Sequence, residues 1–127
     1  MPLVRIELRR GKPSAFKQML TTEIYEAMRE AFNVPEHDRF MVINEHDADN
    51  FIFDRNYLGI ERSDDLVIIQ LTVSNTRSLE TKQAFYARLV ERLRQRPGVR
   101  PEDVFVNFVE VVKENWSFGN GIAQYVV

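Results

Sequence analysis

The feature that most constrains the fold of this chain is an internal repeat, in which the second half matches the first at a constant offset of 65 residues. Identical residues recur at this offset: Lys17-Gln18 with Lys82-Gln83, Glu26 with Glu91, Arg29 with Arg94, Val34 with Val99, Asp38 with Asp103, Phe40 with Phe105 and Glu45 with Glu110. In each copy a strand-like run precedes a helix-like run, and a second strand-like run follows. We therefore predict two βαβ units, each with a right-handed crossover between parallel strands.

Hydrophobic periodicity assigns the elements of each unit. Apolar residues recur at spacings of three and four between Phe16 and Ala31 and again between Phe85 and Leu93, which predicts two amphipathic helices. Ser78 is expected to cap the second of them. Alternating or continuous apolar runs predict strands at residues 1–8, 39–45, 66–73 and 104–112.

These elements predict a single domain of the α/β class, organised as an α+β two-layer sandwich. Its tandem βαβ repeat would form a four-stranded, mainly parallel sheet with both helices on one face. The expected boundaries are a first repeat at about 1–46, an insertion at 47–65, a second repeat at about 66–112 and a C-terminal hairpin at 113–127. The other face of the sheet would be bare, so we expect an oligomer that covers it.

Composition excludes several classes of function. The 127 residues suit one domain, and 17 basic against 19 acidic residues give no reason to expect nucleic acid or an anionic membrane as partner. The absence of cysteine excludes disulfides, thiol chemistry and thiolate metal sites. His37 and His46 lack metal-ligand spacing, so no metal is expected. With no apolar run of membrane-spanning length and no signal-peptide pattern, the cytoplasm is the default location.

Pro2 is the first candidate for chemistry. Removal of Met1, which a small second residue favours, would leave Pro2 as a free secondary amine. An α-amino group has a pKa of about 7.7–8.0, so it is partly neutral near pH 7 and can act as a general base or nucleophile. The structural alternative is that Pro2 only begins an edge strand, where its missing N–H is tolerated. Only the first repeat would present an amine, since Pro2 lies opposite Val67 in the repeat.

Four segments together resemble the tautomerase superfamily and, within it, the malonate semialdehyde decarboxylase group. They are Met1-Pro2-Leu3, Ala31 to Phe40, Leu71 to Ser78, and Trp116 to Gly121. Members of the superfamily work through an amino-terminal proline that is exposed when the initiator methionine is lost. The resemblance implies one tautomerase-like domain over residues 1–127, a homotrimer, no cofactor and a small carboxylated substrate.

The resemblance also implies roles for individual residues. Pro2 would be the catalytic amine, Asp38 its acidic partner, and Arg77 the residue that binds a substrate carboxylate or polarises its carbonyl. Asp38 has an equally weighted alternative, which is to close the turn after Pro35. The alternative for Arg77 is a solvated side chain paired with Glu80. A cation just before a helix N-terminus opposes the helix dipole, which argues against a purely structural role for Arg77.

Four further residues are carried over as substrate-binding candidates. Trp116, Phe118 and Tyr125 would form an apolar wall, although aromatic residues in such a pattern often belong to the core. Asn75 stands where the decarboxylase pattern has a second arginine. An amide can donate a hydrogen bond but brings no charge, so this departure weighs against decarboxylation.

The leading hypothesis is thus a cofactor-independent enzyme in which Pro2 moves a proton in keto–enol tautomerisation of a small 2-oxo or enol acid. A related alternative is decarboxylation or hydration of a 3-oxo or unsaturated acid, with Pro2 cationic and Asp38 activating water. An alternative of another class is a non-catalytic oligomeric binding module, in which Pro2 merely begins a strand.

Overall fold

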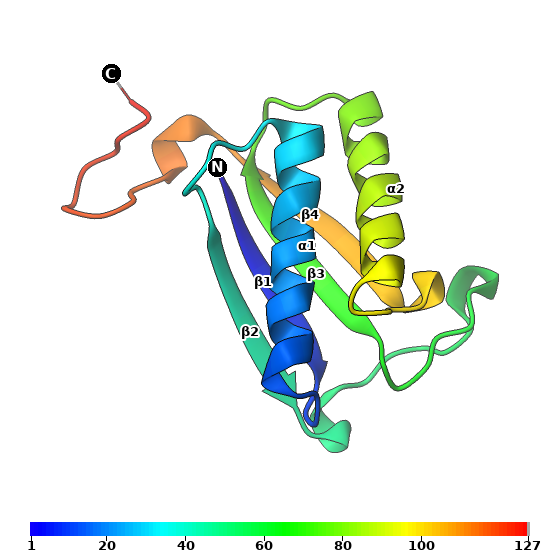
Figure 1. Ribbon diagram of the computed structural model, residues 1–127. Coiled ribbons are helices and arrows are strands. Elements are labelled where there is room, and N and C mark those ends of the chain that lie inside the picture. The colour runs from blue at the N-terminus through cyan, green and yellow to red at the C-terminus, as the bar shows by residue number, and fades with distance from the viewer. Residues whose placement is uncertain (127) are drawn as a thin grey trace.

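The computed structural model describes residues 1–126 and shows a four-stranded sheet covered on one face by two helices (Figure 1). The elements are β1 (Pro2–Arg9), α1 (Ser14–Phe32), β2 (Phe40–His46), β3 (Val67–Ser74), α2 (Leu79–Gln95) and β4 (Val104–Val111). The strand order is β2-β1-β3-β4, with β1 parallel to β2, β3 parallel to β4, and the central pair β1–β3 antiparallel. The predicted α/β class, the mainly parallel sheet and the one-sided helix layer are confirmed.

The repeat is an approximate two-fold symmetry of the molecule. The strands β1 and β3 begin and end at positions that correspond in the repeat, and so do the first residues of α1 and α2, Ser14 and Leu79. In the central antiparallel pair Arg5 lies opposite Gln70, its own counterpart in the repeat, so the two-fold axis passes through this pair. The same ion pair occurs in both halves: Lys17 with Glu45 at 3.2 Å, and Lys82 with Glu110 at 2.9 Å.

The core lies between the helices and the sheet face that they cover. Alternate residues of the central strands are buried there, namely Val4, Ile6 and Leu8 of β1 and Val67, Ile69, Leu71 and Val73 of β3. The rings of Phe32 and Phe85 stack at 4.6 Å and join the two helices. Ser78 caps α2 as predicted, since its hydroxyl oxygen accepts a hydrogen bond of 3.1 Å from the backbone N–H of Thr81.

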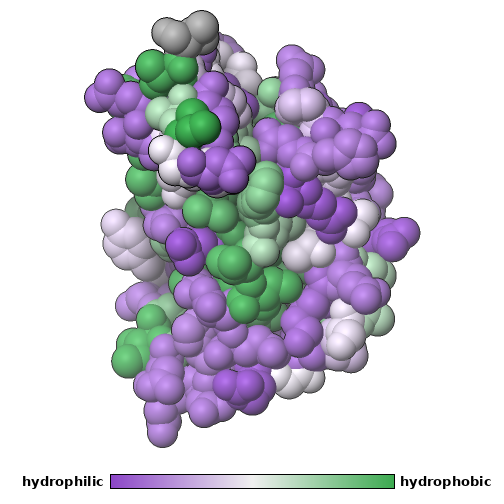
Figure 2. Space-filling model, turned by 90° about the vertical axis from the view of Figure 1, so that its left-hand side faces the viewer, coloured by the Kyte–Doolittle hydropathy of each residue, from purple (hydrophilic) through white to green (hydrophobic). Residues whose placement is uncertain are grey.

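The other face of the sheet carries exposed apolar side chains, as predicted. Phe40 and Val42 of β2 are 51% and 41% exposed, and Phe105 and Val109 of β4 are 45% and 39% exposed. Figure 2 views the side of the molecule that carries β2 and shows hydrophobic side chains gathered in a band among hydrophilic ones. Apolar surface of this kind favours association with another protein surface. Within residues 1–126, no helix is both long and apolar enough to cross a membrane.

The predicted insertion is in part a repeated segment. It contains two turns of 3₁₀ helix, Ala48–Asn50 and Tyr57–Gly59, and the first corresponds in the repeat to a matching turn at Lys113–Asn115. An aromatic pair follows each matched turn: Phe51 with Phe53 at 5.5 Å, and Trp116 with Phe118 at 5.4 Å. The repeat therefore extends past the predicted boundaries at 46 and 112.

The C-terminal hairpin predicted at 113–127 does not form among the described residues. Residues 113–126 contain turns and no strand, and Val127 lies outside the described residues. The side-chain amide of Gln124 bonds to backbone groups of the Gly119 turn instead. It accepts from the N–H of Phe118 at 2.9 Å and donates to the carbonyl of Gly119 at 2.7 Å. Figure 1 shows this segment extending away from the sheet.

Candidate active site

The topology brings three chain segments to one edge of the sheet. Because β1 and β3 are antiparallel, Pro2 pairs with Val73, close to the turn that leads to Arg77. Because β1 and β2 are parallel, the loop that precedes β2 and carries Asp38 ends at the same edge. β1 is an interior strand, so the edge-strand explanation for Pro2 is wrong. Its missing N–H is tolerated because Pro2 is the first residue of the strand.

Asp38 faces the N-terminal amine. The nitrogen of the amine on Met1 lies 3.9 Å from Asp38 Oδ2, and the side chains of Met1 and Asp38 are only 6% and 13% exposed. Asp38 also closes the turn, because its backbone N–H donates to the carbonyl of Pro35 at 3.2 Å. Both of the roles considered for Asp38 are thus compatible with one geometry. Its other oxygen, Oδ1, is buried and has no hydrogen-bond partner among residues 1–126.

Arg77 is half-buried and packs its guanidinium on Phe32, with the central carbon 4.6 Å from the ring centroid. Its Nη1 atom is buried and has no hydrogen-bond partner in the part of the chain that the structure describes. The alternative pairing with Glu80 is absent from the ion pairs of residues 1–126. A buried cationic donor without a partner is costly, which is typical of a residue kept for a ligand.

The ionisable groups at this edge act on one another. Burial lowers the pKa of the N-terminal amine, the Asp38 charge opposes this shift, and the Arg77 charge adds to it. Burial raises the pKa of Asp38, against the opposing charges of the amine and Arg77. Burial also lowers the pKa of Arg77 and raises that of Tyr125. Such coupled shifts in a partly buried cluster are typical of functional sites.

A cavity of about 410 Å³ opens beside this cluster. It is lined by Met1, Ser74, Thr76, Arg77, Lys113 and Tyr125. Of the predicted site residues, the structure therefore brings Arg77 and Tyr125 to the cavity, with Asp38 and Pro2 at the same edge of the sheet. Ser74, Thr76 and Lys113 were not predicted as site residues.

The three predicted aromatic residues form one connected wall. The rings of Trp116 and Phe118 stack at 5.4 Å, and Phe118 meets Tyr125 edge to face at 4.8 Å. Trp116 Nε1 donates a hydrogen bond of 3.2 Å to Ser74 Oγ, which anchors the wall to the end of β3. The wall thus reaches the cavity through Tyr125.

Asn75 does not join the cavity. Its side chain is exposed, and its backbone N–H donates to the carbonyl of Val111 at 3.1 Å, which joins the ends of β3 and β4. Residues 1–126 also contain no group of three or more acidic or histidine side chains that could hold a metal ion.

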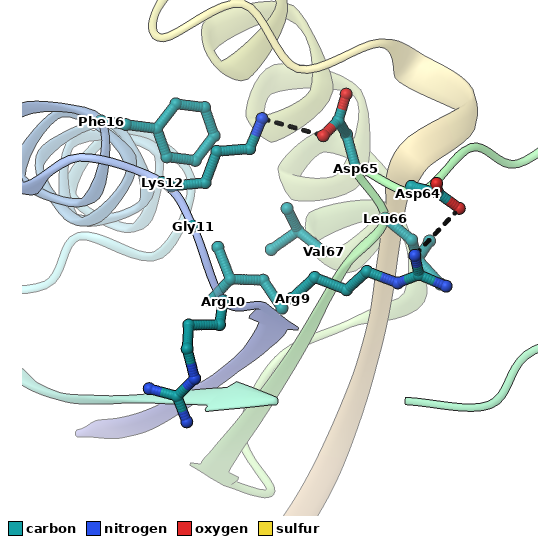
Figure 3. A pocket seen from close by; sticks show the side chains of 10 residues that line it. Arg9, Arg10, Gly11, Lys12, Phe16, Asp64, Asp65, Leu66 and Val67 are labelled. Atoms are coloured by element: carbon teal, nitrogen blue, oxygen red, sulfur yellow. Dashed lines mark ion pairs between the residues drawn. The ribbon is translucent and has the colours of Figure 1, made fainter. Parts of the chain in front are cut away.

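A second cavity lies at the opposite end of β1 (Figure 3). Its lining includes Arg9, Gly11, Lys12 and Leu66, which the repeat relates to Ser74, Thr76, Arg77 and Met1 of the first cavity. The two cavities are therefore counterparts under the two-fold axis.

Two cations of the second cavity pair with carboxylates that line the same cavity. Lys12 contacts Asp65 at 2.8 Å and Arg9 contacts Asp64 at 3.3 Å, as the dashed lines in Figure 3 mark. The position that corresponds to Pro2 is Val67, which lies inside the chain and has no free amine. Only the cavity at the N-terminal edge combines an amine with a cation that lacks an ion-pair partner within residues 1–126.

Comparison with known proteins identifies the family. Two family models, each described as tautomerase enzyme, match residues 38–119 and residues 2–60. The chain belongs to the tautomerase family. This tautomerase-family chain is 41% identical over 126 residues to the probable tautomerase YusQ of Bacillus subtilis (strain 168), with 99% of each chain covered. It is 36% identical to the probable tautomerase YrdN of the same organism, with 99% of this chain and 97% of YrdN covered.

Solved structures of malonate semialdehyde decarboxylases are similar over nearly the whole chain. One, with decarboxylase and hydratase activities, has a TM-score of 0.91 at 33% identity and covers 97% of this chain and 95% of its own. The FG41 malonate semialdehyde decarboxylase, inhibited by 3-bromopropiolate, has a TM-score of 0.91 at 35% identity. The match covers 98% of this chain and 94% of the FG41 chain. A symmetric trimer of fused 4-OT shares the fold, with a TM-score of 0.79 at 19% identity over 97% of each chain.

Proposed function

We propose that this tautomerase-family chain is a cofactor-independent enzyme that catalyses keto–enol tautomerisation of a small carboxylated substrate. One observation carries the proposal: the N-terminal amine lies 3.9 Å from Asp38 Oδ2, beside the half-buried Arg77. That amine is carried by Met1, and burial lowers its pKa. We infer that a Pro2 amine exposed at the same end of β1 would share this environment and be partly neutral near pH 7, able to accept a proton.

In the proposed mechanism, removal of Met1 leaves the Pro2 nitrogen as the amine at this edge of the sheet. The neutral amine takes the proton from the enol O–H of the substrate while the C=O bond forms. The protonated amine then delivers a proton to C3, where the C=C bond had been. One proton leaves oxygen and one reaches carbon, so the reaction is an isomerisation that balances without a cofactor.

Arg77 is proposed to bind the substrate carboxylate or the enolate oxygen. The second cavity offers an internal precedent, because Lys12, the counterpart of Arg77, holds the carboxylate of Asp65 at 2.8 Å. Arg77 forms no such ion pair within residues 1–126, and its buried Nη1 lacks a hydrogen-bond partner there, so Arg77 is proposed to take a carboxylate from outside the chain.

Asp38 and the aromatic wall are proposed to support this chemistry. The Asp38 charge raises the pKa of the Met1 amine against the effect of burial, and it is proposed to act in the same way on the Pro2 amine. Trp116, Phe118 and Tyr125 would supply the apolar side of the substrate site. Asn75 is left out of the proposed site because it is exposed and is not among the residues that line the cavity.

Decarboxylation or hydration of a 3-oxo or unsaturated acid is the second candidate. It is favoured by the similarity to the malonate semialdehyde decarboxylases. Asp38 Oδ1, which has no hydrogen-bond partner within residues 1–126, would accept a hydrogen bond from water in this reaction. In this reaction Pro2 would stay cationic and Asp38 would activate the water. The uncharged Asn75, where the decarboxylase pattern has an arginine, weighs against it.

A homotrimer is proposed as the assembly that covers the bare sheet face. The exposed Phe40, Val42, Phe105 and Val109 provide the apolar surface for it. The trimeric assembly of the structurally similar fused 4-OT makes three copies the number to test first.

The deciding experiment follows the ultraviolet decay of phenylenolpyruvate with wild-type protein and with Pro2→Ala, after intact mass has shown that Met1 is absent. We expect the wild type to accelerate ketonisation and the variant, which has a primary amine in place of the secondary amine of proline, to be slower; complete loss of a positioned base would cost about 10²–10⁴-fold. No acceleration by the wild type would sink the tautomerase proposal. If the wild type then consumes malonate semialdehyde, the result supports the second candidate. If it does not consume this compound, the result supports the binding module.

A further inference from the structure

Phe32 is the aromatic contact of Arg77. The central carbon of the guanidinium lies 4.6 Å from the centroid of the Phe32 ring, and Phe32 is only 7% exposed. Phe32 is the last residue of α1, whereas Arg77 precedes α2, so the contact joins two helices at the edge of the sheet that carries the amine. Arg77 Nη1 has no hydrogen-bond partner within residues 1–126, so the ring is the contact that orients the guanidinium.

The Phe32 ring is itself held in a cluster of aromatic side chains. It stacks on the ring of Phe85 at 4.6 Å and meets the ring of Phe108 at 5.7 Å. The ring of Tyr86 stacks on that of Phe108 at 5.4 Å, so the cluster draws on α1, α2 and β4. A ring that is packed closely by neighbours from several elements has little freedom to turn. Phe32 therefore presents a fixed aromatic face to Arg77.

The aromatic cluster interrupts the two-fold symmetry of the core. Four non-aromatic residues correspond to the four rings in the repeat: Pro97 to Phe32, Leu20 to Phe85, Thr21 to Tyr86 and Ile43 to Phe108. Elsewhere the two halves of the core are alike, as Ile24 and Leu89 or Val34 and Val99 show, so filling the core does not by itself require these rings. The cluster is present only beside the cation of the copy that has the amine.

The two corresponding cations are held in different ways. Lys12 pairs with Asp65 at 2.8 Å and lies 5.0 Å from the centroid of the Phe16 ring. Arg77 is held by the Phe32 ring, and an aromatic face stabilises a cation without accepting its N–H groups. A guanidinium packed on such a face can still bind a carboxylate through two parallel hydrogen bonds. The contact with Phe32 thus fixes Arg77 and leaves its donors for a ligand.

From these contacts we infer that Phe32 is a positioning residue, whose ring holds Arg77 in place for the substrate carboxylate before the substrate arrives. The inference rests on the proposed function, since it assigns the substrate carboxylate to Arg77. Phe32 is not among the residues that line the cavity, so it acts through Arg77 and takes no part in proton transfer. Without the ring, Arg77 would have to be ordered during binding, which weakens carboxylate binding by about 2- to 12-fold.

The test measures carboxylate binding without any reaction. The fluorescence of Trp116, the only tryptophan of the chain, is titrated with 3-phenylpropanoate, a carboxylate that has no enol. We expect Phe32→Leu to bind it about 2- to 12-fold more weakly than wild type. Phe51→Leu is the control, since Phe51 is 6% exposed and packs on His46 beyond the far end of β2, and its affinity should match that of wild type. Phe32→Met, which fills the space with a flexible apolar chain, repeats the test if Phe32→Leu does not fold.

Two further readouts separate positioning from a general loss of packing. In Arg77→Met, the additional change Phe32→Leu should cause no further loss of affinity, because the group that the ring orients is already absent. In the ketonisation assay, Phe32→Leu should raise KM and leave kcat unchanged. A partly unfolded variant would instead lower the apparent kcat at an unchanged KM.

The outcomes also separate this inference from the proposed function. Equal affinities of wild type and Phe32→Leu, an equal loss in Phe51→Leu, a loss that persists in Arg77→Met, or no binding by wild type would overturn the role of Phe32. Phe32-dependent binding combined with ketonisation that is unaffected by Pro2→Ala would support the role of Phe32 and refute the proposed proton transfer. Ketonisation that depends on Pro2, with binding that does not depend on Phe32, would refute the role of Phe32 alone.

Discussion

Replacing Arg77 by methionine should separate activity from stability. Methionine keeps a long side chain over the Phe32 ring, which lies 4.6 Å from the guanidinium, but it removes the charge and the donors. Arg77 Nη1 is buried without a hydrogen-bond partner in residues 1–126, so the arginine is held at a cost in the free protein. We expect the free energy of unfolding to stay the same or rise in Arg77→Met, while kcat/KM falls.

The magnitudes follow from the contacts of Arg77. An unsatisfied buried donor costs about 1–3 kcal/mol, and the cation–π contact with Phe32 returns about 0.5–2 kcal/mol. At the midpoints of these ranges the difference is about 0.8 kcal/mol in favour of methionine, which corresponds to a Tm higher by about 3 °C for a domain of this size. The lost hydrogen bond to a substrate carboxylate, about 1.5–3 kcal/mol, lowers kcat/KM by about 10- to 150-fold.

The assay pairs thermal unfolding, followed by circular dichroism at matched protein concentration, with kcat/KM for enol ketonisation. Matched concentration is needed because assembly raises the apparent stability. Lys12→Met is the control, since its exposed ion pair with Asp65 is expected to contribute at most about 1 kcal/mol and nothing to the reaction. A Tm several degrees lower in Arg77→Met, with activity lost only in proportion to the unfolded fraction, would refute the reasoning and make Arg77 structural.

Three further changes test other parts of the account. In Asp38→Asn the loss of a charge that raises the amine pKa should move the acid limb of the pH profile of kcat/KM to lower pH, and a move to higher pH would contradict it. The carboxylate of Asp103 accepts hydrogen bonds from the N–H and the hydroxyl of Ser63 at 2.7 and 2.6 Å, and Asp103→Ala leaves both donors without an acceptor. Urea titration should therefore show that Asp103→Ala lowers the free energy of unfolding by about 2–4 kcal/mol, and Ser63→Ala by about 1 kcal/mol. Phe40→Asp places a charge on the bare sheet face, and light scattering should show smaller particles; an unchanged mass would place the interface elsewhere.

Much of the fold could be predicted because it is determined by local patterns. The spacing of apolar residues defines both helices, and the Ser78 cap marks the start of α2. The repeat identifies two equivalent βαβ units but not how they join. The antiparallel contact between β1 and β3 depends on tertiary packing around the Arg5–Gln70 pair, which no local signal specifies.

Part of the candidate site was predicted, through the family resemblance for Tyr125 and with the support of the topology for residues next to regular elements. Arg77 and Asp38 adjoin the starts of α2 and β2, and their positions follow from the topology. Lys113 reaches the cavity through a 3₁₀ turn whose path depends on long-range contacts, so sequence reasoning missed it. Asn75 was expected in the site because the family resemblance places a second arginine at its position. The chain leaves the strand after Ser74, and the alternation of a strand no longer applies there.

The claim that an amine at the start of β1 is the catalytic base is tested most directly by comparing two preparations with the same residues from Pro2 onward. In one Met1 has been removed and in the other it is retained, and intact mass verifies both. The measurement is the rate of phenylenolpyruvate ketonisation at equal protein concentration. The account predicts fast ketonisation only in the preparation that begins at Pro2. Equal rates in the two preparations would contradict it.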